Sequence, residues 1–426
     1  MEVRTPFNFD KRMHIFRIAT QRHEKVMYLD SNNYPDKFGK FNWVILVGET
    51  AGLEINNNFP DPWNALSDFI KNKKTPLLGS FLAYDLKNSR EKLHTSQEDK
   101  TGFPLLACWE PAVIIAERRD GSLLYFGNYE QYLNETDVPV ETENVLNDIS
   151  LTPALTKEEY LKGFEKIHQA LQAGDIYEMN FCQHFSSYIK NIQPISLYKK
   201  LNKLSPAPFS GIVKYNESWL ICSSPERFLQ KTGDELISQP IKGTIKKFAS
   251  ENENNAAMLQ LKENPKEINE NVMIVDLVRN DLSYFAIKNG VQVTELCEVY
   301  PFATVNHMIS TVNVNLKPHT APTEILAKAF PMGSMTGVPK IKALEIADAL
   351  ENFQRRLYSG SVGYFTNEGD FDFNVVIRSL TWNEQTGYFS LSAGSAVTIQ
   401  ANGEDEYNEC MLKTEALFNA IKKEWN

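Results

Sequence analysis

Strand-length apolar runs follow one another along this chain without a regular alternation with helices, and this order limits the fold most. Residues 43–47, 78–84, 112–116 and 123–126 are such runs, and polar or turn-forming stretches separate them. A doubly wound α/β protein would instead repeat strand, helix and strand at a steady period. The pattern therefore predicts an α+β protein built on large antiparallel sheets.

One helix is marked at both of its ends. Thr156 followed by Glu159 is a capping box, apolar residues then recur on one face, and Gly174 is a helix stop. Residues 209–215 and 218–223 are strand-like runs around a short polar turn, which predicts a hairpin. We also predict helices at residues 339–350 and 404–421 and strands at residues 362–365, 373–380 and 388–392.

A polar, acidic and proline-containing stretch at residues 135–153 separates the strand-rich first part from the helix that follows Thr156. Such a composition is typical of a connector between domains. With 426 residues, the chain is long enough for two ordinary domains. We predict an N-terminal domain with its linker at residues 1–150 and a second domain at residues 151–426.

The formal net charge of −10 argues against a nucleic-acid-binding surface. No apolar run approaches the roughly 18–20 residues of a membrane helix, and the first residues lack a signal-peptide core. The five cysteines are scattered and show no metal-knuckle spacing, so they indicate free thiols in a reducing compartment. We expect a cytoplasmic protein with neither nucleic acid nor membrane as a partner.

Two pairs of glutamates stand three residues apart, Glu267 with Glu270 and Glu406 with Glu409. On a helix this spacing places both side chains of a pair on one face. Two such helices could direct their carboxylates to one point and hold Mg²⁺, which prefers oxygen ligands and keeps several waters. A solvated helix face is the ordinary alternative for either pair.

Four more side chains have the chemistry of a reactive site, although each also has an ordinary interpretation. Lys242, between Ile241 and a Gly-Thr pair, is either a snorkelling lysine or a buried amine nucleophile. Glu226, at a strand exit, is a surface residue or a general acid. Arg378, predicted late in a strand, is a structural ion-pair partner or a carboxylate-binding group, and His307 alone is typical of a core histidine.

Eight segments, taken in order, resemble those of the chorismate-utilising enzymes. This family includes anthranilate synthase, aminodeoxychorismate synthase, isochorismate synthase and salicylate synthase chains. The segments are 174–180 (GDIYEMN), 224–228 (SPERF), 240–244 (PIKGT), 270–281 (ENVMIVDLVRND), 333–340 (GSMTGVPK), 358–364 (YSGSVGY), 377–379 (IRS) and 406–409 (EYNE). The resemblance implies large antiparallel sheets packed face to face and flanked by helices, and it favours the catalytic interpretation of each residue above.

Position 242 separates the reactions within this family. Anthranilate synthases usually carry a small residue there, whereas aminodeoxychorismate synthases of the main type carry lysine, as this chain does. The resemblance therefore implies conversion of chorismate to 4-amino-4-deoxychorismate for 4-aminobenzoate and folate synthesis, with Lys242 as nucleophile and Glu226 as general acid. The alternatives are anthranilate synthesis, isochorismate or salicylate synthesis, and a non-catalytic regulatory subunit that binds tryptophan.

The resemblance also implies a set of binding residues. Mg²⁺ would be held directly by Glu270 and Glu409, with Glu267 and Glu406 behind them. The implied substrate-binding residues are Gly243, Thr244, His307, Tyr358, Arg378, Gly394, Ser395, Ala396 and Lys413.

Three positions depart from the family pattern: Glu178, where Gln is common, and Met332 and Ala396, where glycine is usual. The added methyl group of Ala396 and the changed residues 397–402 leave the local geometry there open. No segment resembles a glutaminase and no fused lyase follows, so we expect a separate glutamine amidotransferase subunit to supply ammonia. Residues 26–31 look like the segment that lines a tryptophan pocket in relatives, which makes tryptophan a further candidate ligand.

Overall fold

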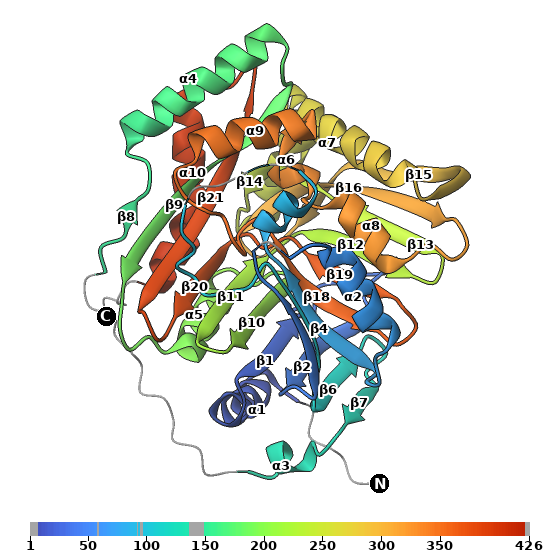
Figure 1. Ribbon diagram of the computed structural model, residues 1–426. Coiled ribbons are helices and arrows are strands. Elements are labelled where there is room, and N and C mark those ends of the chain that lie inside the picture. Colours follow the sequence, from blue (N-terminus) through green and yellow to red (C-terminus); the bar gives the residue numbers. More distant parts are fainter. Residues whose placement is uncertain (1–6, 58, 92, 94–96, 136–148, 422–426) are drawn as a thin grey trace.

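The computed structural model describes residues 7–57, 59–91, 93, 97–135 and 149–421, which form two large antiparallel sheets with helices around them (Figure 1). One of them, here called sheet A, has a short strand, β8 (Thr152–Pro153), paired to the side of β9. The strands of sheet A follow the order β17 (Gly337–Val338), β9 (Glu178–Tyr188), β21 (Tyr388–Thr398), β20 (Ser379–Asn383), β11 (Ser218–Ser224), β10 (Phe209–Tyr215), β1 (Lys25–Asp30), β2 (Phe41–Val47), β6 (Val113–Arg118) and β7 (Leu123–Phe126).

The other sheet, here called sheet B, contains the longest strand, β15 (Ala286–Pro301), which pairs with β16 at one end of the sheet. The remaining strands of sheet B follow the order β14 (Ile241–Lys246), β16 (Val305–Leu316), β13 (Glu235–Gln239), β12 (Arg227–Thr232), β19 (Phe371–Asn374), β18 (Ser361–Thr366), β4 (Leu77–Leu82), β5 (Leu106–Glu110) and β3 (Ala51–Ile55).

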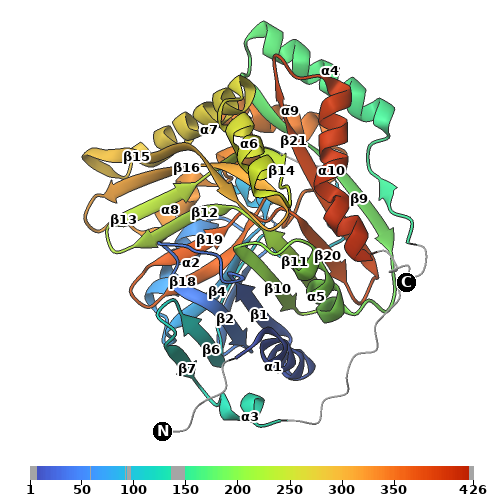
Figure 2. The same cartoon turned by 180° about the vertical axis from the view of Figure 1, so that it is seen from behind.

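Helices surround the sheets, and two of them, α7 and α10, carry the glutamate pairs predicted from the sequence. Figure 2 shows α10 running along β21 and β9, with α6, α7 and β14 beside it. The helices are α1 (Phe9–Arg22), α2 (Pro62–Lys71), α3 (Glu130–Leu133), α4 (Lys157–Ala173), α5 (Pro194–Leu204), α6 (Glu251–Lys262), α7 (Pro265–Ser283), α8 (Pro322–Ala329), α9 (Lys340–Leu350) and α10 (Gly403–Ile421), with 3-10 turns η1 (Tyr84–Ser89) and η2 (Gly333–Met335).

The apolar core lies between the two sheets, where buried side chains of both meet, such as Trp109 and Phe228 from sheet B and Tyr215 from sheet A. The opposite face of sheet A is covered by α1, α5 and α10, and its β9–β21 end is also covered by α4 and α9. Burial of both faces explains the near-continuous apolar runs in its strands. The predicted α+β fold, with antiparallel sheets packed face to face and flanked by helices, is confirmed.

Strands from residues 1–150 are built into both sheets. β1 pairs with β10 in sheet A, and β4 pairs with β18 in sheet B. The first residues of the chain therefore contribute to the same core as the rest. The division into two domains at residue 150 stays a prediction, and residues 136–148 of the expected connector lie outside the described residues.

Local sequence signals located several elements correctly. Thr156 and Glu159 form the predicted capping box of α4, and Gly174 ends the helix with a left-handed φ of 77°. The predicted hairpin is β10 and β11, and the apolar runs near residue 45 and residue 125 are β2 and β7. All five cysteines are buried and free. Among the described residues, no helix is both long enough and apolar enough to cross a membrane.

The prediction of a single strand at residues 373–380 is wrong. β19 ends at Asn374 in sheet B and β20 begins at Ser379 in sheet A, so the intervening residues cross from one sheet to the other. This crossover is apolar because Val375 and Val376 are fully buried, and a buried crossover has the same composition as a strand. Arg378 is therefore not late in a strand but at the end of the crossover, with a left-handed φ of 49°.

Candidate active site

Two helices carry the predicted carboxylate pairs, Glu267 and Glu270 on α7 and Glu406 and Glu409 on α10. Glu270 and Glu406 are 6% and 1% exposed, and each has one carboxylate oxygen without a hydrogen-bond partner among the described residues. Burial raises the pKa of Glu270 to about 7, and it also raises the pKa values of Glu267 and Glu406. A cation between the helices would stabilise the ionised form of these carboxylates.

A lysine ammonium group already lies between the two helices. Lys266 Nζ is 3.2 Å from Glu406 Oε1 and 3.9 Å from Glu270 Oε1. Burial lowers the pKa of Lys266, but the two carboxylates outweigh this and hold the pKa above its usual value. In the part of the chain that is described, no three acidic, histidine or cysteine side chains are gathered as a ready-made metal site. The charge and the all-oxygen donor set nevertheless fit Mg²⁺, if the carboxylates turn toward it.

Lys242 lies on β14 and is only 9% exposed. Its Nζ donates a hydrogen bond to Glu178 Oε1 on β9 at 2.5 Å. Burial lowers the pKa of Lys242, but the carboxylates of Glu178 and Glu270 outweigh it and raise the pKa above the usual value. Lys242 is therefore a buried ammonium rather than a snorkelling surface lysine, and it has to lose a proton before its nitrogen can act as a nucleophile.

Gly243 brings β14 close to α7. Its φ is 88°, a conformation that favours glycine, and a β-carbon at this position would lie 3.0 Å from Glu267 Oε2. The glycine therefore allows the backbone beside Lys242 to pack directly against a predicted metal-binding carboxylate.

Thr244, His307 and Arg378 form a hydrogen-bonded chain. Arg378 Nη2 donates to His307 Nε2 at 3.2 Å, so the imidazole proton resides on Nδ1, which donates to Thr244 Oγ1 at 2.8 Å. Burial and the charge of Arg378 hold the pKa of His307 well below its usual value, which keeps the ring neutral. Arg378 itself forms no ion pair with a carboxylate among the described residues, and burial lowers its pKa to about 10. Its guanidinium is suited to a carboxylate from outside the protein.

Gly394, Ser395 and Ala396 lie in β21, which pairs with β9. Alternation along the strand places Gly394 and Ala396 on one face, whereas the side chain of Ser395 points to the other and lies 3.1 Å from the hydroxyl of Tyr160. Lys413 on α10 donates to the carbonyl of Gly394 at 3.0 Å and pairs with Glu409 at 2.6 Å. A lysine thus connects the carboxylates of α10 to this strand.

Tyr358 is buried, but the described residues around it differ from those around Arg378. It borders a pocket with His184, Ser379 and Tyr388 under the inner face of sheet A. Among the described residues, its hydroxyl forms no hydrogen bond with the other predicted substrate-binding side chains. The structure therefore does not bring Tyr358 into the same hydrogen-bonded group as His307 and Arg378.

Glu226 lies between β11 and β12 and is 4% exposed. Burial raises its pKa to about 7, although Ser334 and Lys242 oppose this. A carboxyl group that is partly protonated at neutral pH is suited to donate a proton in catalysis. Because Glu226 and Lys242 influence each other electrostatically, the predicted acid and the predicted nucleophile belong to one cluster.

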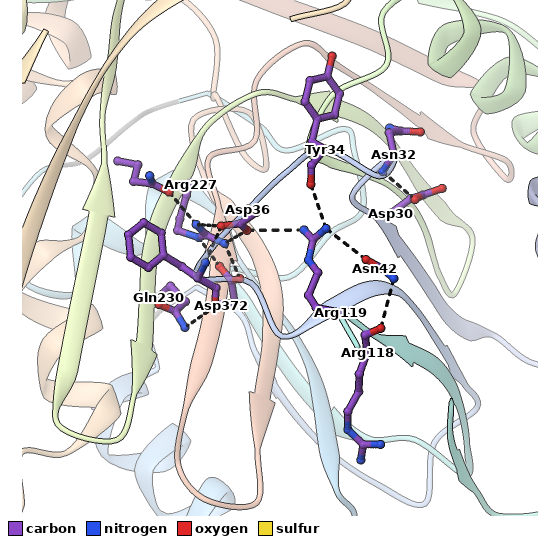
Figure 3. A network of polar contacts seen from close by, with 12 residues as sticks. Asp30, Asn32, Tyr34, Asp36, Asn42, Arg118, Arg119, Arg227, Gln230 and Asp372 are labelled. Atoms are coloured by element: carbon purple, nitrogen blue, oxygen red, sulfur yellow. Dashed lines mark hydrogen bonds and ion pairs between the residues drawn. The ribbon is translucent and has the colours of Figure 1, made fainter. Parts of the chain in front are cut away.

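The side chain of the next residue, Arg227, forms hydrogen bonds and ion pairs with several residues (Figure 3). Its guanidinium forms a two-pronged contact with Asp372 at 2.9 and 3.0 Å, pairs with Asp36 at 2.5 Å, and donates to Gln239 at 2.6 Å. Asp36 comes from the loop between β1 and β2, and Figure 3 shows it between Arg227 and Arg119. A loop from the first forty residues therefore anchors the backbone beside Glu226.

Replacing Asp372 by alanine is expected to destabilise the protein by about 3 kcal/mol, because it leaves the buried Arg227 without its two-pronged partner. Thermal unfolding of the purified protein would show this as a lower midpoint. Asp68→Ala is the matched control, since the Asp68 side chain is 77% exposed and its ion pair is weak. Equal midpoints for the two variants would contradict the prediction.

Comparison with known proteins shows which family this chain belongs to. A family model described as chorismate binding enzyme matches residues 24–419. The chain belongs to this chorismate-binding family. Every residue of the candidate site lies within the matched range. The family assignment and the α+β fold both agree with the resemblance seen in the sequence.

Two relatives within the chorismate-binding family carry the name aminodeoxychorismate synthase. Aminodeoxychorismate synthase component 1 of Klebsiella aerogenes is 33% identical over 358 residues, which covers 82% of this chain and 78% of that protein. The chloroplastic aminodeoxychorismate synthase of Arabidopsis thaliana is 38% identical over 292 residues, covering 68% of this chain but only 31% of the plant protein.

A solved structure supports the fold of the chorismate-binding family. Anthranilate synthase component I from Streptococcus pneumoniae superposes with a TM-score of 0.78 at 22% identity, covering 90% of this chain and 93% of the other. At this identity the likeness concerns the fold alone.

The N-terminal segment that resembles the lining of a tryptophan pocket in relatives borders a small pocket in this structure. Residues 26–30 lie within β1, and the pocket is lined by Asp30, Ser31 and Trp43 as well as by the Asp36–Arg227 pair. Asp30 already accepts hydrogen bonds from Arg12 and from the hydroxyl of Tyr28. The structure provides a pocket there, and tryptophan as its ligand stays a prediction.

Several side chains of the site were absent from the predicted set. Glu178 was noted as a departure from the family pattern but was given no role, and its contact with Lys242 is visible only in the fold. Lys266 stands one residue before Glu267 on the same helix, so a search for a cation near the glutamates could have found it. Asp36 and Asp372 had no local signal, because they meet Arg227 from distant segments.

Proposed function

We propose that this chain converts chorismate and ammonia to 4-amino-4-deoxychorismate, the reaction of the aminodeoxychorismate synthases, for 4-aminobenzoate and folate synthesis. The observation that supports this most is the buried Lys242, held 2.5 Å from Glu178 in one charge cluster with Glu226. A buried ion pair adds little to stability compared with apolar packing, whereas perturbed pKa values concentrate at functional sites. A buried lysine beside a buried acid is therefore better explained by chemistry than by folding.

In this proposal the substrate is bound through its carboxylates. Arg378 has no carboxylate partner among the described residues, and Lys413 lies beside the backbone of Gly394 and Ser395. Tyr358 is assigned to the same task from the pocket that it lines with His184, Ser379 and Tyr388. Gly243, Thr244, His307 and Ala396 then shape the site around the ring.

The reaction divides one difficult substitution into two easier ones. The amine of Lys242 bonds to ring carbon 2, and Glu226 protonates the 4-hydroxyl, which leaves as water. Ammonia then bonds to carbon 4 and expels Lys242 from carbon 2. The enolpyruvyl group is retained, so the neutral His307 has no proton to transfer.

We assign Mg²⁺ to the carboxylates of α7 and α10. Glu270 and Glu409 would hold it directly, with Glu267 and Glu406 behind them. When bound, the ion would neutralise charge on a substrate carboxylate and among the glutamates. Glu270 and Glu406 each have a carboxylate oxygen that accepts no hydrogen bond among the described residues, and the ammonium of Lys266 lies between the helices; both observations support this assignment.

The ammonia is proposed to come from a separate glutamine amidotransferase subunit. The Klebsiella relative is named as component 1, which implies a second component for that protein. By analogy the active species would be a heterodimer, in which this chain binds chorismate and the partner releases ammonia.

The product assay tests the proposed function. Purified protein given chorismate, Mg²⁺ and an ammonium salt at high pH is expected to consume chorismate without producing fluorescent anthranilate. Adding an aminodeoxychorismate lyase should then release 4-aminobenzoate, and omitting Mg²⁺ should stop turnover. Anthranilate formed without a lyase would identify anthranilate synthesis instead, and a product formed without any nitrogen source would identify an isochorismate or salicylate synthase.

The regulatory-subunit alternative is distinguished by calorimetry. A non-catalytic chain would bind tryptophan in the pocket beside β1 but would not turn over chorismate with Mg²⁺. Turnover with tryptophan binding would assign the pocket to regulation of an active enzyme, and turnover without it would remove tryptophan from the proposal.

A further inference from the structure

Lys242 is a buried ammonium, yet the proposed reaction needs its neutral amine. The hydrogen bond from Lys242 Nζ to Glu178 Oε1 at 2.5 Å is the only one that this ammonium forms among the described residues. Glu178 is 1% exposed, and its other oxygen, Oε2, has no hydrogen-bond partner in the described part of the chain. A proton that leaves Lys242 therefore has one protein acceptor in hydrogen-bond contact, the carboxylate of Glu178.

The neighbouring charged groups are less suited to accept this proton. Glu226 faces Lys242 from the β11–β12 connection but has to be protonated to act as the acid. Glu267 and Glu270 face it from α7 and Glu409 from α10, where all three are assigned to the metal.

The remaining charged or titratable neighbours cannot take the proton either. Lys413 on α10 is a cation, and the ring of His307 on β16 is occupied by hydrogen bonds with Thr244 and Arg378.

The backbone holds Glu178 in place. β9 is paired on one side with β21, where Thr398 lies opposite Glu178, and on the other with β17, where Val338 lies opposite it. Gly337 in β17 approaches so closely that a β-carbon there would lie 2.2 Å from the carbonyl oxygen of Glu178. Strand pairing fixes the backbone of Glu178, and its buried carboxylate lies within the hydrogen-bond reach of Lys242 that proton transfer requires.

We infer that Glu178 is the proton acceptor of Lys242, a catalytic role that rests on the proposed function of Lys242 as nucleophile. The proton moves from Nζ to Oε1, which leaves a neutral amine and a neutral carboxyl group. The amine then bonds to ring carbon 2, while the 4-hydroxyl takes a proton from Glu226 and leaves as water. When ammonia bonds to carbon 4, Lys242 departs with its electron pair and recovers its proton from Glu178. Glu226 regains its own proton from solvent.

The variant Glu178→Gln tests this inference, because it keeps the size and hydrogen-bonding capacity of the side chain but removes its basicity. Gln is common at this position in the family pattern, so the fold is expected to tolerate it. The measurement is the rate at which Lys242 forms an adduct with chorismate and Mg²⁺ in the absence of ammonia, followed by mass spectrometry from about pH 6 to 9.

The readout is the rate of adduct formation in the variant divided by the wild-type rate at the same pH. Glu226 titrates in both proteins, so its effect on the two rates cancels in this ratio. In the wild type the proton passes from Lys242 to Glu178, so this step does not depend on the pH of the solvent. In Glu178→Gln it has to leave to solvent, so the ratio is expected to be far below one at pH 6 and to rise by up to about tenfold per pH unit. Glu178→Asp keeps a base with a shorter reach, so its ratio should be lowered but independent of pH.

Glu351→Gln is the matched control, since Glu351 is also buried and ion-paired, with Arg355 at 2.6 Å, but does not contact Lys242. Its ratio should stay near one. A pH-independent ratio near one for Glu178→Gln would overturn the proton-acceptor role, and so would a rate above that of the wild type, which would show that Glu178 only holds Lys242 protonated. If the wild type forms no adduct but turns over with ammonia, the nucleophile role of Lys242 fails as well, and the two failures are thereby distinguished.

Discussion

Lys242→Ala is expected to form no adduct with chorismate and to lose at least about a thousandfold in turnover with ammonia. Removal of a nucleophile leaves only the contributions of binding and electrostatic stabilisation, and losses of this size or larger are typical. Mass spectrometry of the wild type with chorismate and Mg²⁺, but without ammonia, should show the mass of chorismate less one water on the peptide that contains Lys242. The same peptide of the variant should be unmodified.

The burial of Lys242 against Glu178 makes a second variant necessary in this experiment. Lys242 is 9% exposed, so loss of its side chain also leaves Glu178 as an unpaired buried carboxylate, and the variant is expected to unfold at a lower temperature for that reason alone. Lys242→Ala combined with Glu178→Gln removes both charges of the ion pair, so no unpaired charge of this pair stays buried. Chorismate binding by the double variant, measured by calorimetry, would show that the site is intact. An adduct on another lysine, or turnover close to that of the wild type, would contradict the nucleophile assignment.

The parts of the site that depend on local spacing could be predicted from the sequence. Glu267 and Glu270 share one face of α7 because residues three apart on a helix always do. The capping box at Thr156 is equally local, and it located the start of α4 to the residue. Gly243 was predicted only as a substrate-binding residue, and its close approach to Glu267 on α7 is visible only in the fold.

The contacts that define the chemistry could not be predicted, because they join segments that are distant in sequence. Glu178 meets Lys242 across 64 positions, and Asp36 meets Arg227 across 191. Neither pairing has a periodic signal, since each depends on which strands become neighbours in two large sheets. The mistaken strand at residues 373–380 has the same origin. A crossover buried between two sheets is as apolar as a strand, and only the tertiary fold shows where the chain changes sheets.

Glu226→Gln is expected to lower the rate of adduct formation by about 10²–10⁴-fold, because the amide cannot protonate the departing hydroxyl. The pH profile should change as well. Burial raises the pKa of Glu226 to about 7, so the protonated acid is lost and wild-type kcat/KM is expected to fall as the pH rises through that value. This decline should be absent in the variant. A variant with the wild-type rate and the same decline would assign the acid to another group.

The same substitution should stabilise the protein, and the sign follows from linkage. The pKa of Glu226 is raised on folding, so the unfolded chain releases its proton first, and stability is lost as the pH rises from the unfolded value through about 7. Above that range the folded protein buries a charge that Gln lacks, and the pKa difference corresponds to roughly 3 kcal/mol in favour of the variant. Thermal midpoints of Glu226→Gln and the wild type at pH 5 and pH 8 would test this. A gain in stability at pH 8 that disappears at pH 5, together with the loss of activity, would show that Glu226 is kept for catalysis at the expense of folding. Equal midpoints for the variant and the wild type at pH 8 would contradict the raised pKa.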